Sequence, residues 1–96
     1  MNNTYILQIG NSDNKLTQKE WSEYVNKIII VVKRHSDEIH FSGGSSNWEP
    51  WQNYCMIFTL ISEDKLSLFI KILTDIKNEF NQDSVALTIG NTQFLE

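Results

Sequence analysis

The chain has 96 residues, of which 41% are hydrophobic and 21% are charged, and its formal net charge is −4. This length predicts a single globular domain over residues 1–96 with one hydrophobic core. The composition excludes a disordered chain. The acidic balance argues against general nucleic-acid binding, which needs a basic surface, and favours a protein partner that is itself basic.

Three features predict a cytoplasmic protein without membrane association. The N-terminus lacks the basic region and long apolar core of a signal peptide. The longest apolar run covers residues 28–32, whereas a membrane-spanning helix needs about 20 apolar residues. The single cysteine, Cys55, allows no intrachain disulfide, which suits a reducing compartment.

A strand and then a long helix are predicted in the first third of the chain. Residues 5–9 form a short apolar run followed by turn residues. Thr17 and Glu20 have the spacing of a capping box, the reciprocal pair that begins a helix. Apolar residues then recur at helical spacing as far as His35. The β-branched residues 28–32 favour a strand, but the longer-range signals agree on a helix.

The rest of the chain is predicted to form a strand, a second strand, a helix and a further strand. Residues 38–42 alternate in polarity and residues 55–61 form the most apolar run, so each predicts a strand. Ser62 is the expected N-cap of a second helix that reaches Phe80. Residues 84–89 alternate again. Gly90-Asn91 has the composition of a two-residue hairpin turn, after which residues 92–95 would return as an edge strand.

This order predicts a ferredoxin-like α+β sandwich, βαββαβ, with an antiparallel sheet, two helices on one face and room for an extra C-terminal edge strand. The other sheet face would carry the residues that are out of phase with the core. It would either stay exposed or pair with a second copy. Its expected members are Glu38, His40, Ser42, Ser84, Ala86 and Thr88, with some residues of the two apolar strands.

The most unusual segment, residues 43–54, holds two of the three tryptophans and the single proline. The predicted topology brings it to the same end of the domain as residues 10–16 and 81–83. Large aromatic side chains ringed by amides and hydroxyls are typical of a recognition surface. The predicted partner-binding residues are Trp48, Trp51, Asn47, Glu49, Gln52, Asn53, Tyr54, Asp13 and Ser12.

Two arrangements of these tryptophans are open. Both rings could pack over the helix ends, since tryptophan is highly buried on average. The alternative is that Pro50 makes the rings diverge, so that one anchors the loop and the other contacts a partner. We expect the second arrangement.

No catalytic residue, cofactor or metal site is predicted. The spacing of Glu38, His40 and Cys55 matches no zinc pattern. Cys55 lies in an apolar strand, where thiols are usually inert packing. The Gly43-Gly44 segment lacks the lysine of a phosphate-binding loop.

The sequence therefore favours a small acidic protein-binding module over an enzyme. Such a module would be an inhibitor, an immunity protein, an antitoxin or a phage-borne antagonist that docks on a basic partner through its aromatic loop. The alternative is a protein that binds or sequesters a metabolite or nucleotide, as a monomer or a homodimer. A third hypothesis is a homodimer held by the mixed sheet face.

Overall fold

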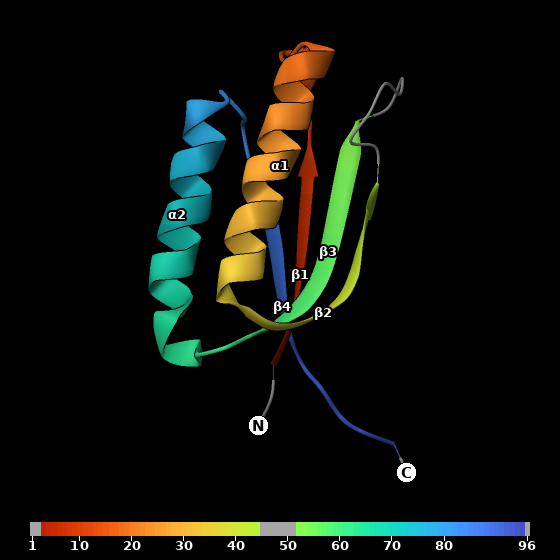
Figure 1. The fold of residues 1–96 in the computed structure, drawn as a ribbon, viewed down its shortest axis with the longest axis vertical. Helices are drawn as coiled ribbons and strands as arrows, with labels where there is room; N and C mark the ends of the chain where they lie inside the picture. The colour runs from red at the N-terminus through yellow and green to blue at the C-terminus, as the bar shows by residue number, and fades with distance from the viewer. Residues whose placement is uncertain (1–2, 45–51, 96) are drawn as a thin grey trace.

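A computed structural model describes residues 3–44 and 52–95 of the chain. Four strands and two helices follow one another in the order strand, helix, strand, strand, helix, strand (Figure 1). The strands are β1 (Asn3–Gly10), β2 (Ser36–Gly44), β3 (Asn53–Leu60) and β4 (Ala86–Asn91), and the helices are α1 (Gln18–His35) and α2 (Leu66–Glu79). Short 3₁₀ turns, η1 (Ser12–Asn14) and η2 (Glu63–Lys65), precede the two helices.

The strands form one antiparallel sheet in the order β2-β3-β1-β4. Each βαβ crossover therefore skips one strand, and both helices lie on the same face of the sheet (Figure 1). This arrangement confirms the predicted ferredoxin-like α+β sandwich.

The first helix begins where the capping box predicts. Thr17 is its N-cap: the Thr17 side chain accepts from the backbone N–H of Glu20, and the Glu20 carboxylate accepts from the backbone N–H of Thr17. The helix continues through the β-branched run to His35. Tertiary packing outweighs strand propensity here, because Ile28 and Val32 are fully buried on the stripe that faces the sheet.

The C-terminal hairpin predicted at Gly90-Asn91 is wrong. Both residues continue β4, because the long first strand offers them partners: Thr4 pairs with Gly90 and Asn3 with Asn91. Residues 92–95 form no strand. They leave the sheet as a tail (Figure 1), with Phe94 75% and Leu95 88% exposed.

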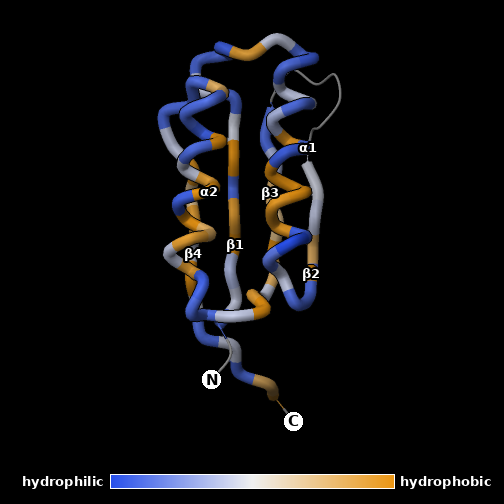
Figure 2. The backbone as a smooth tube through the Cα atoms, turned by 60° about the vertical axis from the view of Figure 1, so that its left-hand side comes forward, coloured by the Kyte–Doolittle hydropathy of each residue, from blue (hydrophilic) through white to orange (hydrophobic). Residues whose placement is uncertain are grey.

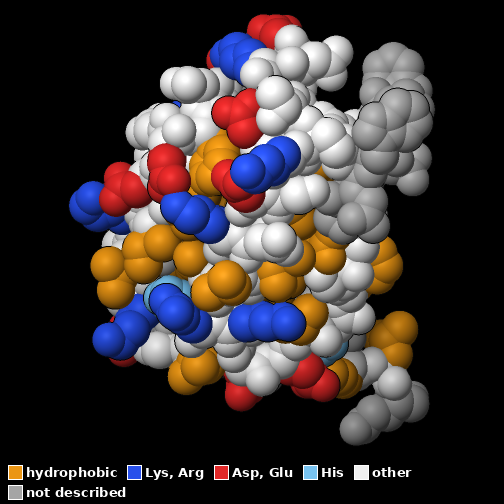
Figure 3. Space-filling model, turned by 45° about the horizontal axis from the view of Figure 1, so that its top comes forward, with side chains coloured by type: hydrophobic (Ala, Val, Ile, Leu, Met, Phe, Trp, Pro, Cys, Tyr) orange, Lys and Arg blue, Asp and Glu red, His pale blue; other side chains and the backbone are white. Residues whose placement is uncertain are grey.

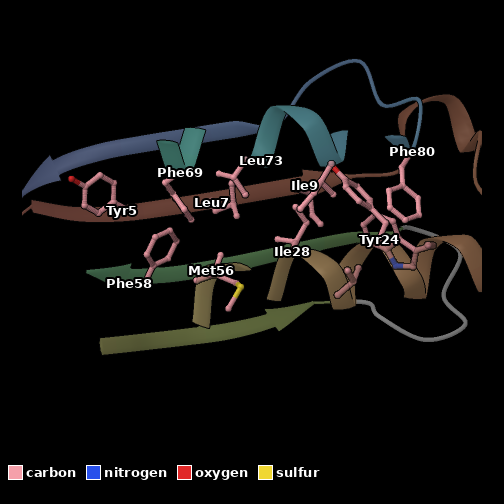
Figure 4. Close-up of a cluster of buried hydrophobic side chains, with 14 residues drawn as sticks. Tyr5, Leu7, Ile9, Tyr24, Ile28, Met56, Phe58, Phe69, Leu73 and Phe80 are labelled. Carbon is pink, nitrogen blue, oxygen red and sulfur yellow. The ribbon is translucent and has the colours of Figure 1, made fainter. Parts of the chain in front are cut away.

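The hydrophobic core fills the space between the sheet and the two helices (Figure 4). Hydropathy along the backbone shows the same layer, with hydrophobic residues concentrated in the middle of the strands and helices (Figure 2). Phe58 of β3 is fully buried in this core: its ring stacks on Tyr5 at 5.9 Å and meets Phe69 edge-on at 5.7 Å. This contact joins the sheet to α2.

One polar group in this core has no partner among the described residues. Tyr24 of α1 is fully buried with its ring 5.1 Å from that of Phe80, and its hydroxyl makes no hydrogen bond there. Burial alone raises the pKa of Tyr24 to about 12. An unsatisfied buried hydroxyl destabilises a fold.

Candidate functional site

Two surfaces are candidates for function: the end of the domain at which three connections meet, and the sheet face opposite the helices. At the first, named here the polar end, residues 10–16, 52–53 and 81–83 lie together as the predicted topology requires. The Asn11 amide donates to the Gln52 side-chain oxygen, the Ser12 backbone N–H donates to the Gln82 side-chain oxygen at 2.7 Å, and Lys15 pairs with Asp83 at 2.8 Å.

The amides of the polar end cross-link the chain. Gln82 is only 4% exposed, and its Nε2 donates to the carbonyl of Phe80. The Asn11 side chain bonds both the N–H and the carbonyl of Leu16 at 3.0 Å. Gln52 Nε2 donates to Gln18 Oε1 at 2.8 Å. Gln52, predicted to contact a partner, thus ties the connection before β3 to the start of α1.

The structure places some of the predicted partner-binding residues and not others. Ser12 also joins the network, since its hydroxyl accepts from the Asp83 backbone N–H at 3.3 Å. Asp13 is exposed, with a positive φ of 53°. Asn47, Trp48, Glu49 and Trp51 lie outside the described residues, as does the predicted division of roles between the two tryptophans.

Asn53 and Tyr54 were expected in the loop but belong to β3. The hairpin is longer than predicted, because Gly44 and Gly43 continue the ladder and pair with Tyr54 and Cys55. Tyr54 is half-buried against the core, and its hydroxyl lies 2.7 Å from Ser42 Oγ. The Tyr54 hydroxyl is therefore hydrogen-bonded to a residue of the neighbouring strand.

The second candidate is the open sheet face, which no helix covers in the part of the chain that the structure describes (Figure 1). Register and alternation assign to it Thr4, Ile6, Gln8, Glu38, Phe41, Cys55, Ile57, Thr59, Ala86 and Thr88. Glu38 is the one charged residue in this set. The centre is apolar, since Ile6 pairs with Ile57 and Ile57 pairs with Phe41.

Ser42 was expected on the open sheet face, and this expectation is wrong. The register of β2 against β3 shifts between Ile39 and Phe41, so that Ile39 pairs with Phe58 and Phe41 with Ile57. This irregularity moves Phe41 to the open face and Ser42 to the helix-facing register opposite Met56. The Phe41 ring is 51% exposed and lies over Gly43, where an added Cβ would be 2.8 Å from its Cζ.

Neither surface shows catalytic geometry in residues 3–44 and 52–95. Cys55 is a half-buried free thiol on the open face, and His40 is exposed where β2 is irregular. Among these residues no cluster of three or more His, Cys, Asp or Glu side chains could hold a metal ion. No helix within them is long and apolar enough to cross a membrane.

The chain matches no protein-family model, and no curated protein is similar to it in sequence. Its structure is similar to the crystal structure of a dimeric ferredoxin-like protein from an uncultured marine organism, with a TM-score of 0.54 over 99% of this chain and 92% of that one. The two sequences are 11% identical. At this identity the likeness is evidence of a shared fold, and the chain has the ferredoxin-like α+β fold.

Proposed function

We propose that this protein is a binding protein that acts as a homodimer, with the open sheet faces of two copies packed together. The observation that carries this proposal is the apolar row on that face, in which Phe41 is 51% exposed and its neighbours Ile57 and Ile6 are half-buried. Sheets in stable domains normally bury such a face against another layer. The structural neighbour is itself described as dimeric, which supports the proposal.

Size and charge also support self-pairing. The four strands lie about 4.8 Å apart and have six to nine residues at about 3.4 Å each, so that the sheet face spans roughly 500 Å² in projection. This footprint is at the lower end for a specific interface, so the expected dissociation constant is on the order of micromolar. A two-fold axis would bring each patch against its own copy, and with one carboxylate, Glu38, among its residues the face carries little charge to repel itself.

Phe41→Glu is expected to turn the dimer into a monomer in sedimentation velocity between about 1 and 100 µM, because it replaces the most exposed ring of the apolar patch with a carboxylate. The matched control is Leu68→Glu on α2, which is 49% exposed against 51% for Phe41 and lies on the opposite side of the molecule. The control should stay dimeric. A monomeric wild type, or a Phe41→Glu protein that still dimerises, would overturn the proposal.

The same pair of variants tests small-molecule binding between the copies. A metabolite or nucleotide held there should raise the melting temperature of the wild type and the control but not that of Phe41→Glu, since a ligand stabilises only the state that binds it.

A second candidate function is docking of a basic protein partner at the polar end. The cross-linked connections support it, because a rigid platform lowers the entropy lost when a loop binds. In this proposal Trp48 or Trp51 contributes an anchor, as in an inhibitor or immunity protein. Each tryptophan would be changed to alanine and the affinity for a partner purified from the native host would be measured by calorimetry. Loss of a true anchor should cost about 2 kcal/mol or more, and unchanged affinity in both variants would exclude this site.

A further inference from the structure

A separate hollow of about 250 Å³ lies where α1 ends and α2 begins, at the opposite end of the domain from the polar end. Its lining combines three basic side chains, Arg34, His35 and Lys65, with three hydrophobic ones, Leu60, Ile61 and Phe69, and the hydroxyl-bearing Ser62. It opens on the helical side of the molecule. There, lysine and arginine side chains lie among hydrophobic ones (Figure 3).

Backbone and ring contacts hold this hollow in place. The Ile61 backbone N–H donates to the His35 carbonyl at 2.9 Å, which joins the segment after β3 to the end of α1. The His35 ring lies 5.4 Å from the ring of Phe69, and its Nδ1 is 2.9 Å from the carbonyl of Val31. Since that carbonyl can only accept, Nδ1 carries the hydrogen. The walls are therefore built from ordered elements.

The charges in this hollow are unusual for an acidic chain. The ion pairs among residues 3–44 and 52–95 engage Lys15, Lys27 and Lys71, so Arg34 and Lys65 have no carboxylate partner there. The N-terminus of α2 directly follows Lys65 and adds partial positive charge. The nearest carboxylates along the chain are Asp37, three residues after Arg34, and Asp64, next to Lys65. Neither lines the hollow, and Glu63, which does not line it either, accepts from the Tyr5 hydroxyl.

We propose that this hollow binds a small amphipathic carboxylate, an anionic head group on a short hydrocarbon body. The head group binds Arg34 and Lys65, with the Ser62 hydroxyl as a further donor. The hydrocarbon covers Ile61, which is 67% exposed, and lies against Leu60 and Phe69. The volume suits a ligand the size of a medium-chain fatty acid, and the site functions whether or not the sheet faces pair.

The test is a titration of the full chain with octanoate, followed by amide chemical shifts in ¹⁵N–¹H spectra. Saturable shifts are expected at residues 34–35, 60–65 and 69, with a dissociation constant on the order of 1 mM or tighter. Octanol, the neutral ligand of the same length, should bind at least about tenfold more weakly, because it lacks the charge-assisted contacts.

Arg34→Gln and Lys65→Gln should each weaken octanoate binding about tenfold. The control is Lys19→Gln, which removes the same charge from the other end of α1. Phe41→Glu should bind like the wild type, which separates this site from the sheet-face dimer. Equal affinity for octanol and octanoate, shifts scattered over the surface without saturation, or equal weakening by Lys19→Gln would each refute the proposal.

Discussion

Gly44→Ala is expected to lower the free energy of unfolding by about 3 kcal/mol. Gly44 has a φ of +140°, a conformation that residues with a side chain rarely adopt. An added Cβ would also lie 2.4 Å from the Asn53 carbonyl oxygen and 2.7 Å from the Cα of Tyr54. Both are backbone atoms of the paired strand, so relief requires that the β2–β3 ladder itself move.

Gly90→Ala is the control for this change. Gly90 also lies in a strand, but a Cβ there would meet nothing within 4 Å and its φ is not positive. This variant should be within about 0.5 kcal/mol of the wild type or slightly more stable. Urea unfolding measures both, with a shift of the midpoint at constant slope as the expected signature. Equal midpoints for the two variants would show that the Gly44 geometry is unimportant.

Gly44 also bears on function. It is the last described residue before the segment that contains Trp48 and Trp51. If partner docking uses that segment, Gly44→Ala should reduce binding as well as stability, whereas Gly90→Ala should leave both unchanged.

The free energy of unfolding of the wild type is expected to fall as the pH rises above 10, and Tyr24→Phe is expected to reduce this fall. The pKa of Tyr24 is about 12 in the folded protein and 10.0 in the reference state. The unfolded chain therefore releases this proton first, so the free energy of unfolding falls as pH rises from 10 to 12. The difference corresponds to at most about 2.7 kcal/mol, and solvent screening reduces it to roughly 1–2 kcal/mol.

At neutral pH the same variant should be about 1 kcal/mol more stable than the wild type, because it removes a buried hydroxyl that has no partner among the described residues. Urea unfolding at pH 7 and at intervals from pH 9 to 12 measures both effects. The pKa of Tyr5 is also raised, by burial and by its hydrogen bond to Glu63, but both proteins contain Tyr5, so their difference isolates Tyr24. Parallel curves would show that Tyr24 titrates as in water.

Together these features describe a scaffold with two helices on one face of the sheet and an uncovered face on the other in the described residues. The dimer proposal and the carboxylate proposal use different faces and can fail independently. Docking at the polar end uses a third surface, so all three can be tested on the same set of folded variants.

Local sequence signals determined most of this fold. The capping box at Thr17 and Glu20 and the helical spacing that follows placed α1 correctly, because a cap and an apolar stripe depend on residues close in the chain. The order of strands and helices then limited the topology to the sandwich that the structure has, since crossovers are right-handed. The meeting of the three connections at the polar end follows from that topology.

Tertiary pairing decided what local patterns could not. Phe41 reaches the open face because β2 shifts register against β3. Such a shift moves the residues that follow it to the opposite face of the sheet, although the polar and apolar residues still alternate in the sequence. Gly90 and Asn91 remain in a strand because Asn3 and Thr4 supply hydrogen-bond partners from the far end of the chain. Arg34 and Lys65 likewise line the same hollow only because the fold brings the end of α1 next to the start of α2. Each of these depends on contacts between distant residues, which composition and spacing do not encode.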